Sequence, residues 1–226
     1  ISVLAFIIAV LLEGNIRGKT FFRTVCFLPY IISSVAVSIF FMYFFVKGGL
    51  GTRLFMLFGA EDTTWFTNKN YALFFVAIIY IWQQLGFYMI LYIGGLQNIS
   101  EEIYEAAKID GASEMQILFK IKMPLIKDII LLTLTMCLTG ALRGFDIPFL
   151  LTSGGPGNAS ELMSTYMYKK AFSSNQYGYG STLAVFIIIE SILVVYILRK
   201  IFTSKEQKEE KRIEKERIRR NRRGNH

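Results

Sequence analysis

Four long apolar segments, separated by polar stretches, dominate the pattern of residues along this 226-residue chain. A hydrophobic content of 53% would by itself also fit a soluble protein. The length of the apolar segments does not fit a soluble protein, because a helix needs about 20 consecutive apolar residues to cross the core of a bilayer. We therefore predict an all-α integral membrane protein, a bundle of transmembrane helices whose full spans cover residues 26–46, 72–95, 129–152 and 181–202.

The first twelve residues, Ile1 to Leu12, are also apolar but are too few to cross a bilayer by themselves. A secretory signal peptide would have a basic beginning and a small-residue cleavage site, and this segment has neither. It also lacks an initiator methionine. We therefore expect residues 1–12 to be the last part of a membrane helix whose first part lies upstream.

The distribution of basic residues predicts which face of the membrane each loop occupies. Of 25 lysines and arginines, 19 fall in three segments that share one face if the spans alternate. Basic loops are retained in the cytoplasm, so we place the loop 97–127 and the charged tail 205–226 there, with residues 1–204 forming the membrane domain. The net charge of +8 then requires no nucleic-acid partner. The tail either contacts anionic membrane lipid as a solvated helix or binds another protein.

Polar side chains within the expected spans are candidates for a solute pathway. Two adjacent glutamines near mid-membrane either bond to neighbouring helices or face a polar cavity, since lipid offers no hydrogen bonds. Arg143 and Asp146 are three residues apart on one expected helix, so they can pair, either along a water-filled pathway or as a structural ion pair near the outer surface. A lone mid-span glutamate needs a partner or water. The candidate pathway residues are Trp82, Gln83, Gln84, Arg143, Asp146 and Glu190.

The polar segment Glu101–Pro124 carries its own helix signals between two expected spans. Ser100 can cap a first short helix, which Asp110-Gly111 should stop. Ser113, followed three residues later by Gln116, predicts a capping box for a second short helix that ends at Pro124. Two such short helices cannot build a core of their own. We therefore expect them to pack on the adjoining spans or on another protein.

The same segment resembles a family motif. Its residues Glu105-Ala106-Ala107, Asp110-Gly111-Ala112, Gln116, Phe119, Ile121 and Pro124 resemble the EAA motif of permease subunits of bacterial ABC importers. Further stretches are similar to the carbohydrate branch of that family, the maltose and glycerol-phosphate type: Phe27-Leu28-Pro29, Gly86-Phe87, Gly95-Leu96-Gln97-Asn98-Ile99, Phe145-Asp146, Gly154-Gly155-Pro156 and Gly178-Tyr179-Gly180. One departure is Lys127-Asp128, where the family often has a proline.

The resemblance implies a transport complex in the bacterial inner membrane. A second permease subunit would complete the pathway, two cytoplasmic ATPase subunits would bind ATP and Mg, and an extracellular solute-binding protein would deliver a sugar. This chain would be a non-catalytic subunit with no cofactor of its own, surrounded by membrane lipid. The residues that would fit the EAA loop into a cleft of an ATPase are Glu105, Ala106, Ala107, Asp110, Gly111, Met115, Gln116, Phe119 and Pro124.

Other functions remain open at this point. An ABC permease for a non-sugar solute would share the same motif. An ion-coupled secondary transporter could use Glu190 and the Arg143–Asp146 pair, although such proteins usually contain internal repeats and none is visible. An intramembrane enzyme would need a cluster of ionisable or metal-binding residues, and the one histidine is His226. The sequence contains no G-x-x-x-x-G-K-[ST] phosphate-binding loop, so any ATP would be hydrolysed by another subunit.

Overall fold

The structure is a computed structural model that describes residues 1–14 and 17–224. All regular elements in the described part are helices, and none is a strand. They are α1 (Ser2–Glu13), α2 (Lys19–Ile31), α3 (Ser34–Phe44), α4 (Leu50–Met56), η1 (Trp65–Thr67), α5 (Ala72–Gln97), α6 (Glu101–Ile109), α7 (Glu114–Ile117), η2 (Leu118–Lys122), α8 (Met123–Leu125), α9 (Lys127–Arg143), α10 (Asp146–Thr152), α11 (Met163–Tyr168), η3 (Lys169–Ser173) and α12 (Tyr177–Gly224).

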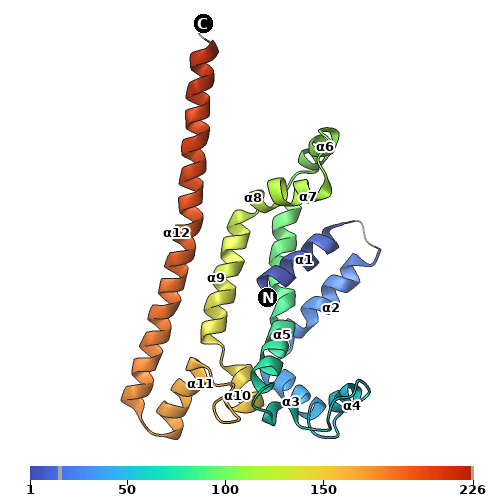
Figure 1. Ribbon diagram of the computed structural model, residues 1–226, viewed down its shortest axis with the longest axis vertical. Coiled ribbons are helices and arrows are strands. Elements are labelled where there is room, and N and C mark those ends of the chain that lie inside the picture. Colours follow the sequence, from blue (N-terminus) through green and yellow to red (C-terminus); the bar gives the residue numbers. More distant parts are fainter. Residues whose placement is uncertain (15–16, 225–226) are drawn as a thin grey trace.

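Three helical stretches are long and apolar enough to cross a membrane: Ala72–Gln97, Lys127–Thr152 and Tyr177–Phe202. They coincide with three of the four spans expected from the sequence. Figure 1 shows α6 and α7 at one end of the molecule, here called the α6 end, and α3, α4, α10 and α11 at the opposite end, the α4 end. The arrangement matches that of a multi-pass helical membrane protein.

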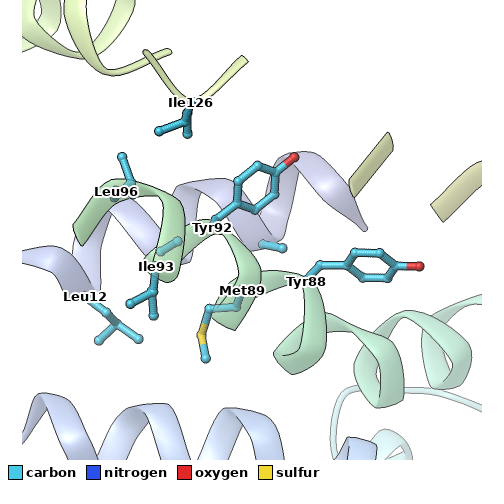
Figure 2. Close-up of a cluster of buried hydrophobic side chains, with 9 residues drawn as sticks. Leu12, Tyr88, Met89, Tyr92, Ile93, Leu96 and Ile126 are labelled. Atoms are coloured by element: carbon cyan, nitrogen blue, oxygen red, sulfur yellow. The ribbon is translucent and has the colours of Figure 1, made fainter. Parts of the chain in front are cut away.

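Helix α5 is the central element of the bundle. It packs against α1 and α2 over much of its length and also contacts α9 and α10. The core on its α6 half contains Met89, Tyr92 and Leu96, all nearly inaccessible to solvent, together with Ala5 and Ala9 of α1 (Figure 2). Small residues on α1 let the two helix backbones approach closely, which is the usual way in which membrane helices gain packing energy.

The single span expected over residues 26–46 is not one helix. The chain forms α2 and α3, which meet at an angle of 96° around Ile32 and Ser33. Pro29 lies inside α2, near its end. Ser33 begins α3, where its side chain accepts a hydrogen bond from the backbone N–H of Val35. Proline disrupts a helix on its N-terminal side, and α2 continues through Pro29 to Ile31, so Pro29 does not by itself account for the break at Ile32.

Helix α2 crosses α5 at Gly86. A Cβ atom at this position would lie 2.1 Å from the backbone oxygen of Cys26, which is closer than any real contact. Next to this crossing, the rings of Tyr30 and Phe87 stack with centroids 4.7 Å apart. The crossing therefore depends on the absence of a side chain at position 86.

A break also interrupts the third long stretch, because α9 ends at Arg143 and α10 begins at Asp146. Helix α10 turns under α5 and packs on α3 and η1. Its buried residues Ile147 and Leu151 join Phe45, Phe75 and Ile79 in a second apolar core at the α4 end. Aromatic rings dominate this core, with those of Phe45 and Phe75 5.0 Å apart.

Helix α12 runs along the outside of the bundle and packs on α9, α11 and η3. The glycine-rich stretch 177–180 is the beginning of this helix. A Cβ atom at Gly180 would lie 2.6 Å from the Cβ atom of Ala171, so this glycine serves close packing against η3. Beyond the span, the backbone of α12 stays helical to Gly224 and extends past the α6 end (Figure 1).

Candidate functional site

The α6–α7 segment, residues 98–126, joins α5 to α9 and projects from the end of the bundle (Figure 1). Helix α6 ends at Ile109 because Gly111 adopts a left-handed conformation, with φ of +77°. This conformation favours glycine, as expected from the Asp110-Gly111 pair. The segment is therefore two short helices around a glycine turn.

The predicted capping box is present at the start of α7. The Ser113 hydroxyl accepts a hydrogen bond from the Gln116 backbone N–H at 3.3 Å, and the Gln116 side-chain oxygen accepts one from the Ser113 N–H at 2.9 Å. Ser100 occupies the position before α6, but its side chain forms no capping bond, so that part of the prediction is wrong. Glu101 and Glu102 lie in the first turn, where their negative charges interact favourably with the positive end of the helix dipole.

Pro124 does not end the second helix as expected. Helix α7 continues into the π-helix η2 and then into α8, and the chain bends at Ile126 before α9 begins. Pro124 lies in the first turn of α8. Pro124 has no backbone N–H, so it donates no hydrogen bond back to η2.

The tip of the segment exposes a group of large apolar side chains. Ile109 is 86% exposed, Met115 is 61% exposed and Phe119 is 56% exposed. By contrast, Ala107 and Ile117 are buried and hold α6 and α7 against the rest of the molecule. A compact group of exposed apolar side chains on a short rigid segment is typical of a contact surface for another protein.

The nine residues expected to contact an ATPase divide by exposure. Met115 and Phe119 belong to the exposed tip, and Ala107 faces inward. The remaining six are all exposed: Glu105, Ala106, Asp110, Gly111, Gln116 and Pro124. Sequence reasoning missed Ile109, the most exposed of the apolar tip residues, although its place directly before the Asp110-Gly111 stop is a usable signal.

An ion pair anchors the α6–α7 segment to the end of α1. The Lys122 ammonium lies 2.6 Å from a carboxylate oxygen of Glu13, the last residue of α1. The Tyr104 hydroxyl donates a hydrogen bond of 3.2 Å to the other oxygen of the same carboxylate, and burial, followed by the charge of Glu13, raises the pKa of Tyr104. These groups border an open cleft of about 1010 Å³ between the end of α1 and the two short helices. Sequence reasoning did not find this cluster, because its members are about a hundred residues apart.

The candidate pathway residues differ in their burial and in their contacts. Gln83 is 2% exposed, and its Nε2 donates to the backbone oxygen of Ile32 at 3.0 Å, while its Oε1 accepts from the Ser34 hydroxyl at 3.4 Å. Of the two alternatives for this residue, the structure shows interhelical hydrogen bonding. Gln84 is half-buried. Trp82 is 41% exposed, with its ring edge-on to Phe41.

Arg143 and Asp146 do not form the expected pair on one helix face. Arg143 ends α9, Asp146 begins α10, and both side chains are exposed. The turn at Gly144–Phe145 separates them, which spacing on a continuous helix could not predict. Glu190 is half-buried on α12. In the described part of the chain, no hydrogen bond or ion pair joins any two of the six candidate pathway residues.

Comparison with known proteins identifies the family. Residues 1–208 match the family described as "Binding-protein-dependent transport system inner membrane component". The probable ABC transporter permease protein YurN of Bacillus subtilis is 37% identical over 207 residues, which are 89% of this chain and 71% of that protein. The multiple sugar-binding transport system permease protein MsmF of Streptococcus mutans is 38% identical over 199 residues, covering 86% of this chain and 68% of that protein.

The fold is also found in a solved structure. A crystal structure of a bacterial alginate ABC transporter, in complex with an alginate pentasaccharide-bound periplasmic protein, contains a chain that superposes with a TM-score of 0.79. The two are 22% identical, and the match covers 88% of this chain and 70% of that one. Its described helices, its sequence relatives and this likeness agree, and the chain belongs to the family of inner-membrane permease components of binding-protein-dependent ABC transporters.

Proposed function

We propose that this chain is the permease subunit of an ATP-driven importer for sugars or oligosaccharides. The match of residues 1–208 to the permease family carries this proposal. The substrate class is supported by the multiple-sugar relative and by the alginate transporter with the same fold. An ion-coupled secondary transporter has no comparable support, because the related proteins are ABC permeases.

The α6–α7 segment is the part of the chain that contacts the ATPase in this proposal. Its exposed tip, formed by Ile109, Met115 and Phe119, presents apolar side chains that no part of the described chain covers. A convex apolar tip on a short segment fits into a groove of a partner. The ATPase supplies the ATP and Mg sites, and its closure would move the tip relative to the spans.

The same proposal fixes the orientation of the chain. The α6 end faces the cytoplasm of a bacterial cell, together with the basic tail, because basic loops are retained on that side. The α4 end then faces outward, where a solute-binding protein docks and a second permease subunit lies alongside. Closing and opening of the two permeases around a central pathway gives alternating access.

Reconstitution of the whole transporter tests the proposal. The chain, its partner permease and ATPase are placed in proteoliposomes with the solute-binding protein, and entry of radiolabelled maltose, raffinose and an alginate oligosaccharide is measured. We expect uptake of at least one sugar that requires ATP, Mg and the binding protein and that survives an ionophore. Uptake that does not require ATP and that the ionophore abolishes would contradict the proposal and favour ion coupling.

A further inference from the structure

A partly buried ion pair connects two parts of the chain that are far apart in sequence. The Lys122 ammonium and the Glu13 carboxylate are 2.6 Å apart, and their side chains are only 16% and 15% exposed. A second ion pair on the same segment, Lys108–Glu114, is longer, at 3.4 Å, and its side chains are 62% and 80% exposed. The less a pair is exposed to water, the more the loss of one partner costs, whereas fully exposed pairs contribute little. We therefore expect the loss of the Glu13–Lys122 pair to have the larger effect.

Tyr104 closes this pair into a three-membered cluster. Its hydroxyl donates to the Glu13 carboxylate at 3.2 Å, and its ring lies under the Lys122 ammonium, which is 4.8 Å from the ring centroid. The three residues come from α1, α6 and η2. The cluster thus fixes both halves of the α6–α7 segment to the end of α1.

Helix α1 is itself held firmly along the rest of its length. Near its other end, the Ser2 hydroxyl lies 2.6 Å from the Tyr92 hydroxyl of α5, to which Thr133 of α9 also donates at 2.6 Å. Between the two ends, Ala5 and Ala9 have no exposed surface. A helix that is held at Ser2 and at Glu13 and is packed between these two residues moves as one piece.

From these contacts we propose that Glu13, Lys122 and Tyr104 are positioning residues that transmit movement of the α6–α7 segment to α1. Through α1, the movement reaches α5 and α9. The segment already continues covalently into these two spans, and the cluster adds a third attachment at an element that is not its neighbour in sequence. This inference rests on the proposed function, because it takes the segment to be the part that an ATPase moves.

The first experiment measures coupling in the complete transporter. Sugar uptake and ATP hydrolysis are determined in the same proteoliposomes for Glu13→Gln, Lys122→Met and the double variant. We expect each single variant to lower the ratio of sugar transported to ATP hydrolysed about threefold or more, and the double variant to be no worse than the poorer single variant. Lys200→Met is the control, because Lys200 is exposed on α12 and lies outside the α6–α7 segment, and it should keep the wild-type ratio.

Unchanged ratios in the single variants, or effects that simply multiply in the double variant, would overturn the inference. If the wild-type complex shows no ATP-dependent uptake, the proposed function itself fails, and the two failures are thus distinguishable. Tyr104→Phe, which keeps the ring under the ammonium, should lower the ratio less than Lys122→Met.

A second measurement does not depend on transport activity. Spin labels at Leu11 on α1 and Glu102 on α6, both exposed, report the distance between the two elements in the full complex, with Cys26 and Cys137 replaced by alanine. We expect one narrow distance distribution with and without ATP, and a broad one when Lys122→Met is added. An equally narrow distribution in that variant would overturn the inference.

Discussion

Gln83 of α5 donates a hydrogen bond from its side chain to the backbone oxygen of Ile32, 3.0 Å away at the break between α2 and α3. A break in a membrane helix leaves backbone groups without partners, and lipid cannot supply them. The side chain of a neighbouring helix satisfies one of these groups, and Ser34 completes the contact by donating to the Gln83 oxygen. The 96° bend is therefore stabilised from outside the bent segment.

Replacing Gln83 by leucine should destabilise the chain, because the Ile32 oxygen would lose the donor that Gln83 supplies and lipid offers no other. Such a loss costs about 1–3 kcal/mol. We expect a lower thermal unfolding midpoint of the purified transporter in detergent. Gln84→Leu, a substitution of the same type at a half-buried neighbour, should lower the midpoint much less. Equal effects of the two variants would show that Gln83 does not support the bend.

The apolar tip leads to a prediction about assembly. Ile109→Asp places a charge where a partner would bury the most exposed apolar side chain of the tip. We expect the ATPase to be lost from the complex on co-purification, while the partner permease remains bound. Glu61→Lys, at an exposed position of the α4 end, serves as the control and should retain the ATPase. Retention of the ATPase by Ile109→Asp would mean that the tip is not the contact surface.

Gly111 tests the shape of the turn separately from its surface. No atom lies within 4 Å of a Cβ placed on Gly111, so only the positive φ opposes a larger residue. A left-handed conformation costs a branched residue about 1–2 kcal/mol, whereas asparagine adopts it more readily. We expect Gly111→Val to reduce ATP-dependent sugar uptake severalfold and Gly111→Asn to stay near the wild type. Similar uptake by both variants would contradict a role for the backbone conformation.

The candidate pathway residues can be examined by their access to water. Single cysteines at Gln84, Arg143, Asp146 and Glu190 should react with a water-soluble thiol reagent in the assembled transporter if these positions line the pathway. A cysteine at Ile79, which is 1% exposed in the apolar core, is the unreactive control. If all four positions resist the reagent as Ile79 does, their assignment to the pathway is wrong.

The features that the sequence predicts well are those that depend on nearby residues. The span expected at 72–95 agrees with α5 to within two residues, because a long apolar run needs no partner to specify a membrane helix. The capping box at Ser113 and Gln116 and the turn at Gly111 are likewise decided within four residues of chain.

Features that depend on distant contacts were not predictable in the same way. The bend after Ile31 lies within an uncharged run and is stabilised by a side chain about fifty residues further along. The pairing of Glu13 with Lys122 spans 109 residues. The prediction of an Arg143–Asp146 pair was wrong for a local reason. A turn interrupts the helix at this point, although the apolar pattern suggested that the helix was continuous.

The crossing at Gly86 has a mechanical consequence. Because the backbone of α5 there meets the backbone of α2 with no side chain between them, the separation of the two helices at this point has a lower limit set by the peptide units alone. The neighbouring bend at Ile32 is held by a polar side chain, a contact that can exchange partners. A change in the angle between α2 and α3 would therefore turn at Ile32, while the separation of α2 and α5 at Gly86 stays fixed.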